Sequence, residues 1–543
     1  MIFENGIIKT PDLEFNENSG GVGCILYETL KQYENRIALI NSHNDEFITY
    51  KELLKRSIST AIALEKRGIK QHDLMAICSR RENLDGNVPI IAGQFLGCIT
   101  YALDPNETIE VTANLLEQVQ PRIIFVTESS KQLIFETLKK INIQVEIVEF
   151  GEQFKHEFLG LENSDFKPLF IENLKTTCMI HFSSGSTGTP KPICLNHYYY
   201  MALIGPIPHP KSEPCTRKFA NHMIGSVSLR ISNWYWISTS IEMVDAMWNG
   251  KCRLLKDIFD VDQIWFTIAK YKIADIFFRP VDIPLFPSKL PPSLDVSCLR
   301  KVFISGNALH EDLVDSLKQL LPEVELVSMY AMTECGVVTY SYVEKFKVEK
   351  PTCCGLPVSG LHYKIIDLET GKICGFKQPG ELHVKGKRVF NGFHNLDSSE
   401  CFDDEGYFKT GDVVYFDEDF CFFFVDRIKA LLKWKNKLIY PSCIEEVLRS
   451  HPAVNDAMVI GIEDKVEAER LMGVVILKND VEDLSEVDLV KYVEERVEDY
   501  KRLREGVVFV KHFPTTITGK PNRLKVKQMA LELMKRNVNI KYA

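Results

Sequence analysis

The first 175 residues alternate between apolar patterns of helical spacing and short apolar runs of strand length. A capping box at Thr49 and Glu52 precedes apolar residues at helical spacing up to Gly68, which predicts a helix. Short apolar runs at residues 74–79 and 122–126 predict buried strands. This alternation is typical of a parallel sheet covered by helices.

The same pattern continues through the middle of the chain. Asn196 is expected to cap a short helix after the strand that ends at residue 195. Ligands of parallel α/β sheets bind where strands end, so functional residues are expected in the turns that follow these strands. The predicted strands are residues 176–182, 192–195, 273–278, 299–304 and 324–329.

The character of the chain changes twice toward its end. From Thr352 it consists of short strands and turns, which predicts a small β-rich subdomain. The final part returns to a mixed pattern, with a helix whose cap is expected to come from Ser442 and Glu445. We therefore predict an N-terminal domain of residues 1–426 and a C-terminal domain of residues 427–543.

Composition narrows the class of protein. Of the 543 residues, 45% are hydrophobic and 26% charged, which is ordinary for a soluble globular protein of more than one domain. The net charge of −9 and the pI of about 5.9 argue against general nucleic-acid binding and against a polybasic membrane anchor. We expect no transmembrane segment and no signal peptide, because no apolar run has the required length.

Cysteine usage and the last residues bear on the compartment. The fifteen cysteines are scattered, and no C-x-x-C pair has a matching second pair, so we expect reduced thiols and no cysteine metal site. Adjacent Cys353 and Cys354 are expected to be packing residues. The final Lys-Tyr-Ala is not the standard peroxisomal signal, so we expect a cytoplasmic protein, with the peroxisome as the alternative.

The stretch HFSSGSTGTPKPI, residues 181–193, is the strongest chemical signal in the chain. Its glycines permit backbone conformations closed to other residues, and its hydroxyls, N–H groups and lysine can bind a polyphosphate. The spacing is not that of a Walker loop, and a flexible turn is the plain alternative. The candidate phosphate ligands are Ser184, Gly185, Ser186, Thr187, Gly188 and Lys191.

A second polar segment follows the strand predicted to end at residue 329. Tyr330 could cover a base, and Thr333 and Glu334 could contact phosphate and a hard divalent cation, which prefers oxygen ligands. Taken alone, this segment would be an ordinary loop.

Three single residues complete the candidate chemistry. Asp412 follows a glycine and suits the two hydroxyls of a ribose, and Arg427 is a fork-shaped donor for phosphate or ribose oxygens. Lys520 stands on a turn bracketed by glycine and proline, from which it can reach a ligand. Each of them alone would more often be a surface charge.

Taken together and in this order, the segments resemble the adenylate-forming superfamily of acyl-CoA synthetases, 4-coumarate:CoA ligases, beetle luciferases and peptide-synthetase adenylation domains. The similarity covers nearly the whole chain and is greatest to the insect luciferase-like acyl-CoA synthetases. It implies an α/β fold with a large N-terminal domain of two parallel-sheet αβ subdomains and a small β-rich subdomain. A small, mobile C-terminal α/β domain would follow.

The resemblance also implies a role for each segment. Lys520 would be the catalytic lysine of adenylation, and Thr333 and Glu334 would act in catalysis and bind Mg²⁺. Lys429 would be the hinge about which the C-terminal domain rotates to present a second catalytic face that includes Lys433. The nucleotide would be bound by the phosphate-loop ligands together with Gly306, Asn307, Ala308, Tyr330, Ala331, Asp412 and Arg427.

Some positions depart from the pattern of the superfamily. Ala331 and Asn436 stand where glycine is usual, and Pro192 removes one N–H donor beside the phosphate loop. Aromatic rings can wall an apolar acyl pocket, but they cannot supply an imidazole near neutral pH. In place of a histidine pair found in beetle luciferases and many acyl-CoA ligases, the chain has Trp234, Tyr235 and Trp236.

The resemblance therefore implies an AMP-forming acid–thiol ligase of the fatty-acid or 4-coumarate type. It would use ATP, Mg²⁺ and coenzyme A to activate a hydrophobic carboxylic acid as an acyl-adenylate and pass the acyl group to CoA. The open alternatives are a luciferase-like monooxygenase acting on an adenylated luciferin and an acyl-AMP ligase that loads a carrier protein in trans. A degenerate binding protein is the least favoured alternative, because the candidate catalytic and nucleotide-binding residues are all present. We expect a monomer that binds small molecules and no nucleic acid, and the length of the acid stays open.

Overall fold

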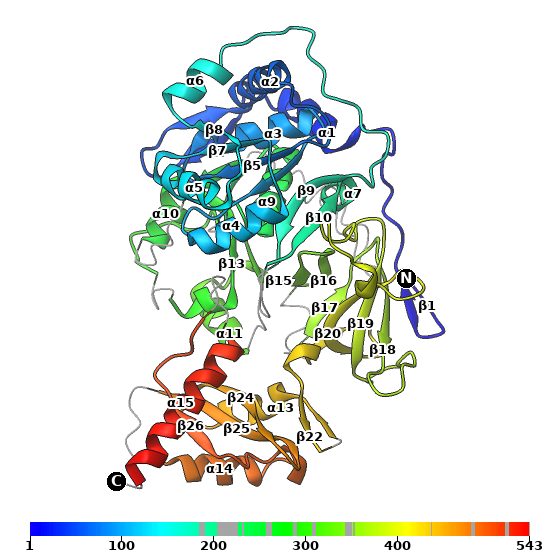
Figure 1. Ribbon diagram of the computed structural model, residues 1–543, viewed down its shortest axis with the longest axis vertical. Helices are drawn as coiled ribbons and strands as arrows, with labels where there is room; N and C mark the ends of the chain where they lie inside the picture. The colour runs from blue at the N-terminus through cyan, green and yellow to red at the C-terminus, as the bar shows by residue number, and fades with distance from the viewer. Residues whose placement is uncertain are drawn as a thin grey trace. The chain divides into compact units, whose positions relative to one another are not determined.

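The computed structural model describes residues 1–183, 190–202, 226–230, 233–256, 263–285, 290–306, 311–342, 350, 353–435, 437–478, 484–515 and 521–541 (Figure 1). Two compact units can be distinguished. The first comprises Met1–Lys364, His383–Lys409 and Asp417–Phe422, and the second comprises Ile365–Leu382, Thr410–Phe416 and Phe423–Ala543. The domain boundary at residue 427 stays a prediction.

A six-stranded sheet in the first unit has the strand order β10-β9-β6-β5-β7-β8 (Figure 1). β9 and β10 pair antiparallel, and the other neighbours pair parallel. The strands are β5 (Leu74–Cys78), β6 (Ile99–Ala102), β7 (Ile123–Val126), β8 (Glu146–Glu149), β9 (Thr177–Phe182) and β10 (Pro192–Asn196).

Both faces of this sheet are covered, which explains why its central strands are continuous apolar runs. In β7, Ile124 and Val126 pack in the core cluster that includes residues of α4 and α5. Phe125 points to the opposite face and packs against Phe154 and Phe158 of α6, with distances between ring centroids of 5.9 and 5.3 Å. The helices of this part are α2 (Tyr50–Lys66), α3 (Val88–Phe95), α4 (Ile109–Gln118), α5 (Glu128–Ile141) and α6 (Glu152–Phe158), with the 3-10 turn η1 (Leu84–Asn87).

A larger sheet includes, within the first unit, a part with the strand order β17-β16-β15-β14-β13-β11-β12-β3-β4. Its central strands are parallel and its two ends are antiparallel. The strands are β3 (Ile37–Asn41), β4 (Phe47–Thr49), β11 (Val227–Arg230), β12 (Cys252–Leu255), β13 (Ile273–Phe278), β14 (Lys301–Ser305), β15 (Glu325–Met332), β16 (Gly336–Tyr342) and β17 (Cys353–Pro357). The associated helices are α1 (Gly21–Gln32), α9 (Ile237–Trp248), α10 (Ile264–Tyr271), η2 (Pro280–Leu285) and α11 (Glu311–Leu320).

Short strands follow β17, as the composition after Thr352 predicts. The hairpin of β1 (Ile2–Glu4) and β2 (Ile7–Lys9) joins them, because Ile8 of β2 lies opposite Tyr363 of β18. The strands of this segment are β18 (His362–Ile366), β19 (Gly380–Lys385), β20 (Phe408–Phe416) and β21 (Phe422–Arg427), with the 3-10 turn η3 (Ser399–Cys401).

The second unit contains a further sheet in which β24 and β25 form a long antiparallel pair. The sheet has a core on each face, since Val459 of β24 packs with α13 and α14 and Ile460 packs with α15. No helix in the described ranges combines the length and apolar character needed to cross a membrane. The elements are η4 (Ile428–Ala430), β22 (Leu432–Trp434), β23 (Lys437–Ile439), α13 (Pro441–Arg449), β24 (Val454–Asp464), β25 (Ala468–Leu477), α14 (Glu486–Glu494), η5 (Asp499–Lys501), β26 (Val507–Phe509) and α15 (Arg523–Lys541).

Helix caps follow the sequence at Thr49, whose hydroxyl accepts from the N–H of Glu52 at 3.2 Å, and at Asn196, and depart from it in a third case. Asn196 caps α7 (His197–Met201), because its side-chain oxygen accepts from the N–H of Tyr199 at 3.0 Å. The cap predicted from Ser442 and Glu445 is wrong. α13 begins earlier, at Pro441, and the Glu445 carboxylate instead accepts from the N–H of Val459 at 2.9 Å.

His197, the first residue of α7, stabilises the start of α1. Its Nδ1 accepts from the N–H of Val22 at 3.1 Å, at a helix end whose own N-cap is Gly20 and offers no side chain. Burial is the main cause that lowers the pKa of His197 to about 4. The ring is therefore neutral in the folded protein near neutral pH.

A buried charge cluster connects α9 to two distant segments. One oxygen of Glu242 accepts from Arg81 at 2.5 Å and from Arg253 at 3.1 Å, and all three side chains are at most 1% exposed. The other amino group of Arg253 donates to Asn87 at 2.6 Å. Two buried guanidinium groups thus share one carboxylate oxygen.

We expect Glu242→Gln to lower the free energy of unfolding by about 3 kcal/mol, because it removes the negative charge that two buried guanidinium groups share. Chemical denaturation of the purified protein measures this. Glu162→Gln is the matched control, since Glu162 forms an exposed ion pair with Lys55 at 2.8 Å and its loss should change the free energy of unfolding far less. Equal effects of the two variants would contradict the assignment.

The pH dependence of stability should reveal His197. Between pH 6.5 and about 4 the unfolded histidine takes up a proton that the folded one excludes, so acidification in this range lowers the free energy of unfolding. His197→Asn keeps an acceptor for Val22 and cannot titrate. At pH 5 the variant should have lost about 2 kcal/mol less than the wild type, relative to pH 7. Parallel stability curves for the two proteins would refute this.

Candidate functional site

The hairpin of β9 and β10 carries the predicted phosphate loop. The N–H of Ser183 donates to the carbonyl of Lys191 at 2.9 Å, and the N–H of Lys191 donates to the hydroxyl of Ser183 at 2.9 Å. Gln118 of α4 donates to the carbonyl of Pro190 at 3.1 Å. Residues 184–189, which include the other predicted ligands of this loop, lie outside the described residues, but these contacts hold the two ends of the loop together.

Residues 389–394, here called the bridging segment, pair with β10 at the edge of its sheet. The N–H of Asn391 donates to the carbonyl of Cys194, and the N–H of His394 donates to the carbonyl of Pro192, both at 2.8 Å. Pro192 is the first residue of an edge strand, a position that tolerates a missing N–H.

The bridging segment also contacts the second predicted group of ligands. The N–H of Phe390 donates to the carbonyl of Glu334 at 2.8 Å, and the ammonium of Lys191 lies 4.9 Å from the ring centroid of Phe393. The pKa of the Cys401 thiol is raised, and burial is the main cause. The charge of Lys191 opposes this rise, and the charge of Glu334 adds to it. Lys191 and Glu334, far apart in the sequence, therefore both lie beside the bridging segment.

Tyr330 and Ala331 lie within a strand and not after it. β15 includes both residues and forms an antiparallel hairpin with β16, in which Tyr330 lies opposite Thr339. The predicted end of this strand came too early, because the pairing with β16 extends it. Thr333 and Glu334 occupy the turn of the hairpin, with half-buried side chains.

Gly306 follows β14 with a φ of +109°, a conformation that favours glycine. A β-carbon at Gly306 would lie 4.0 Å from Cγ of Arg279. Arg279 pairs with Asp282 through two hydrogen bonds of 2.9 and 2.6 Å, and its guanidinium lies 5.6 Å from a ring centroid of Trp236. Arg279 therefore lies beside Gly306 of the predicted nucleotide turn and beside Trp236 of the predicted acyl pocket. Outside the described residues lie Asn307 and Ala308.

The three aromatic residues before α9 differ in burial. Trp234 is a core residue, because only 3% of it is exposed and its indole N–H donates to the carbonyl of Arg80 at 3.4 Å. A β-carbon added at Gly86 would lie 3.3 Å from its ring. Tyr235 and Trp236 are half-buried, and burial is the main cause that raises the pKa of Tyr235 to about 12. These two rings keep surface that a ligand can contact.

Asp412 and Arg427 form an ion pair in the second unit. Nε of Arg427 lies 3.0 Å from Oδ1 of Asp412, whose side chain is 1% exposed, whereas that of Arg427 is 53% exposed. The N–H of Asp412 donates to the hydroxyl of Thr410 at 3.1 Å, and Gly411 between them has a φ of +70°. The structure thus brings these two predicted ligands into direct contact.

The predicted hinge and second catalytic lysine have exposed side chains, Lys429 in η4 and Lys433 in β22. Just before them, the carboxylate of Asp426 accepts from the N–H groups of Arg427 at 2.8 Å and Ser442 at 3.0 Å. Ser442 lies in the first turn of α13, so Asp426 supplies the acceptor that this helix end requires.

The turn that carries Lys520 is closed by its flanks. Thr515 and Pro521 form an antiparallel bridge across it. Lys520 itself and Asn436 lie outside the described residues.

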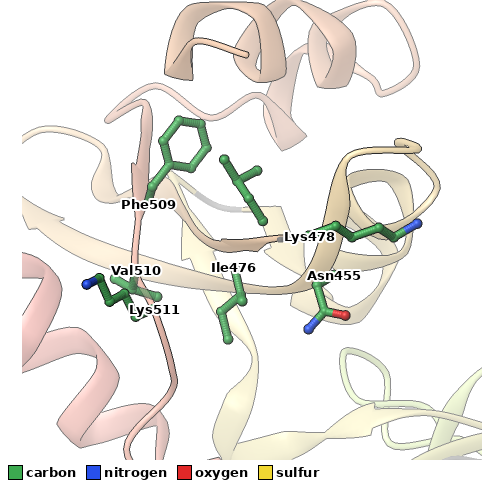
Figure 2. Close-up of a pocket in the computed structure, with 7 residues that line it drawn as sticks. Asn455, Ile476, Lys478, Phe509, Val510 and Lys511 are labelled. Atoms are coloured by element: carbon green, nitrogen blue, oxygen red, sulfur yellow. The ribbon is translucent and has the colours of Figure 1, made fainter. Parts of the chain in front are cut away.

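A hollow on the second unit lies beside the ends of β25 and β26 (Figure 2). In this view Lys478 and Lys511 extend from opposite sides and point away from each other. No predicted site residue of the described ranges contributes to its lining. The lining residues are Asn455, Ile476, Leu477, Lys478, Phe509, Val510 and Lys511.

Sequence reasoning missed a buried polar group directly before the phosphate loop. His181 of β9 is 5% exposed, and its Nε2 lies 3.0 Å from the hydroxyl of Ser240 and 3.3 Å from that of Tyr200. Burial lowers the pKa of His181 to about 4, so the ring is neutral near neutral pH. The available signal was a histidine inside an otherwise apolar strand.

Two protein-family models match most of the chain. Residues 26–394 match the AMP-binding enzyme family, and residues 443–520 match the AMP-binding enzyme C-terminal domain.

Individual relatives span nearly the same length. Luciferin 4-monooxygenase of Photinus pyralis is 28% identical, covering 97% of this chain and 98% of its own. The 4-coumarate–CoA ligase-like 9 protein of Arabidopsis thaliana is 27% identical, covering 92% and 88%.

Solved structures are also similar to this chain over most of its length. The luciferase-like enzyme from the nonluminescent mealworm Zophobas morio has a TM-score of 0.70 at 30% identity, covering 78% of this chain and 99% of its own. ATP-bound MatB from Rhodopseudomonas palustris has a TM-score of 0.83 at 19% identity over 94% and 98%, which is a likeness of fold. The predicted fold class, a large sheet-containing N-terminal domain followed by a small C-terminal one, is confirmed.

Proposed function

This chain belongs to the AMP-binding enzyme family of adenylate-forming enzymes, and we propose that it is an acyl-CoA synthetase for a hydrophobic carboxylic acid. Its similarity to a 4-coumarate–CoA ligase-like protein over most of both chains supports a ligase that uses CoA. The observation that carries the proposal is the bridging segment, which binds both the hairpin of the phosphate loop and the turn of Thr333 and Glu334.

The first proposed step joins the acid to AMP. A carboxylate oxygen attacks the α-phosphorus of ATP, the bond to the bridging oxygen of the β-phosphate breaks, and pyrophosphate leaves. The product is a mixed anhydride with a good leaving group. Because two anions must approach each other, the site needs positive charge and N–H donors, which Lys191, its loop and Lys520 would supply.

The turn of Thr333 and Glu334 fits a magnesium ion. A hydroxyl and a carboxylate are hard oxygen donors, and Mg²⁺ is usually held by one or two carboxylates together with substrate phosphates. Both side chains are half-buried, and the main chain at Glu334 is held by the bridging segment. The ion would neutralise the departing pyrophosphate.

The second proposed step forms the thioester. The thiolate of CoA attacks the acyl carbonyl, the bond to the AMP oxygen breaks, and AMP leaves. The buried carboxylate of Asp412 would accept hydrogen bonds from the ribose hydroxyls, and the exposed Arg427 would donate to ribose or phosphate oxygens. Rotation at Lys429 would exchange Lys520 for the face that includes Lys433 between the two steps.

The half-buried rings of Tyr235 and Trp236 support an apolar acid as substrate. The guanidinium of Arg279 lies 5.6 Å from a ring centroid of Trp236, and two hydrogen bonds to Asp282 compensate its charge. Such a wall suits fatty chains or aryl propenoates better than a second carboxylate.

The direct test is pyrophosphate release with ATP and Mg²⁺ over saturated fatty acids of graded length and 4-coumaric acid. We expect acid-dependent release and, when CoA is added, an acyl-CoA thioester. Absence of acid-dependent release with every acid would contradict the proposal. If the acyl group is transferred to a pantetheinylated carrier protein in preference to free CoA, the acceptor is a carrier protein and the protein is an acyl-AMP ligase.

Similarity to luciferin 4-monooxygenase over 97% of the chain makes light emission the second candidate function. The same assay with beetle luciferin and oxygen compares photon yield with thioester yield. We expect thioester and little light, because Tyr235 and Trp236 cannot supply an imidazole. Strong light with negligible thioester would favour the second candidate.

Lys520→Ala should separate the two half-reactions. We expect adenylation, measured by pyrophosphate release, to fall about 10²-fold through loss of one charge contact, while thioester formation from preformed acyl-AMP persists. Lys525→Ala is the control, since Lys525 is an exposed lysine in the helix that follows and should leave both reactions unchanged. Equal losses in both half-reactions would refute separate catalytic faces.

A further inference from the structure

His181 lies where three elements of the first unit meet. It belongs to β9, and its ring contacts Tyr200 of α7, Ser240 of α9 and the main chain of Tyr235. Nδ1 lies 3.4 Å from the carbonyl oxygen of Tyr235, and Nε2 lies 3.0 and 3.3 Å from the hydroxyl oxygens of Ser240 and Tyr200. The ring therefore has polar partners at both nitrogens, although it is only 5% exposed.

The partners determine which nitrogen carries the proton. A carbonyl oxygen can only accept, so the contact to Tyr235 requires a proton on Nδ1. In the neutral ring Nε2 is then an acceptor, and a hydroxyl of Ser240 or Tyr200 donates to it. The two hydroxyls are 3.2 Å apart, and Ser240 also lies 3.0 Å from the carbonyl of Ile237, so every proton of the cluster has an acceptor.

The histidine joins two parts of the candidate site. Ser183 follows β9 directly, two residues after His181, and closes the phosphate-loop hairpin with Lys191. Its Nδ1 contacts the middle residue of the aromatic segment Trp234–Trp236, which leads into α9.

We propose that His181 is a positioning residue that fixes the aromatic wall of the acid site relative to the phosphate-loop hairpin through the Nδ1–H bond to Tyr235. The inference rests on the proposed function, and it identifies the acid-binding side of the site as the part that His181 controls. A purely structural histidine would affect stability and both substrates alike.

Two variants separate the two nitrogens of the ring. In His181→Asn the amide nitrogen overlies Nδ1 and can still donate to Tyr235. In His181→Gln the polar end overlies Nε2, and the bond to Tyr235 is lost. Wild type and variants are assayed by pyrophosphate release with dodecanoate and with 4-coumarate, and their melting temperatures are compared.

We expect His181→Gln to raise the KM for the acid about tenfold, the worth of one hydrogen bond, with the KM for ATP unchanged. His181→Asn should stay within about twofold of the wild type. Equal effects of the two variants, or a parallel rise of both KM values, would overturn the proposal. Ser240→Ala, which leaves the Nδ1 contact intact, should resemble His181→Asn.

A second readout does not depend on turnover. In protein labelled with ¹⁵N-histidine, the His181 resonances, assigned by their absence in His181→Asn, should show a protonated Nδ1 and an unprotonated Nε2 that do not change from pH 8 to 5.5. If no acid supports turnover, the proposed function fails, while this spectrum still decides the geometry. A proton on Nε2, or titration in this range, would overturn the positioning role by itself.

Discussion

Main-chain hydrogen bonds between the bridging segment and β10 determine the geometry of the candidate site in the first unit. β10 is the terminal strand of its sheet, and an unpaired edge would expose a row of N–H and C=O groups. The bridging segment pairs with some of these groups, and the N–H of its residue Phe390 donates to the carbonyl of Glu334. Since these bonds are directional, they set the distance between the phosphate-loop hairpin and the Glu334 turn more narrowly than apolar packing would.

Buried polar side chains set the position of α9 in the same manner. Ser240 contacts His181, and two residues later Glu242 binds Arg81 and Arg253. Such groups are costly to bury, and they are tolerated only in an arrangement that satisfies them. The start of α9, and with it the preceding aromatic segment, is therefore fixed by specific hydrogen bonds as well as by hydrophobic burial.

Much of this fold follows from local patterns. The strands β9 and β13 and the Asn196 cap were predictable, because apolar periodicity and a side-chain oxygen before a helix are local signals. The extension of β15 was not, since it depends on pairing with β16.

The candidate site divides in the same way. The loop residues around Lys191 stood out because glycines, hydroxyls and a lysine follow one another in the sequence. His181 did not, because Tyr200, Tyr235 and Ser240 are distant in the chain. Glu445 has the spacing of a capping box with Ser442, yet Pro441 starts the helix earlier and Arg523 and the Val459 N–H use its carboxylate. Roles that need a partner from another element cannot be read from one segment.

The carboxylate of Asp426 binds the N–H groups of both Arg427 and Ser442, and Lys429 lies between these two residues in the chain. A large change of the backbone at Lys429 therefore cannot leave both bonds in place. When the bond to Ser442 opens, the first turn of α13 loses its acceptor until water replaces it. In the proposed rotation the strength of this one contact would enter the activation barrier, and Asp426 would govern how long each orientation persists without touching any substrate.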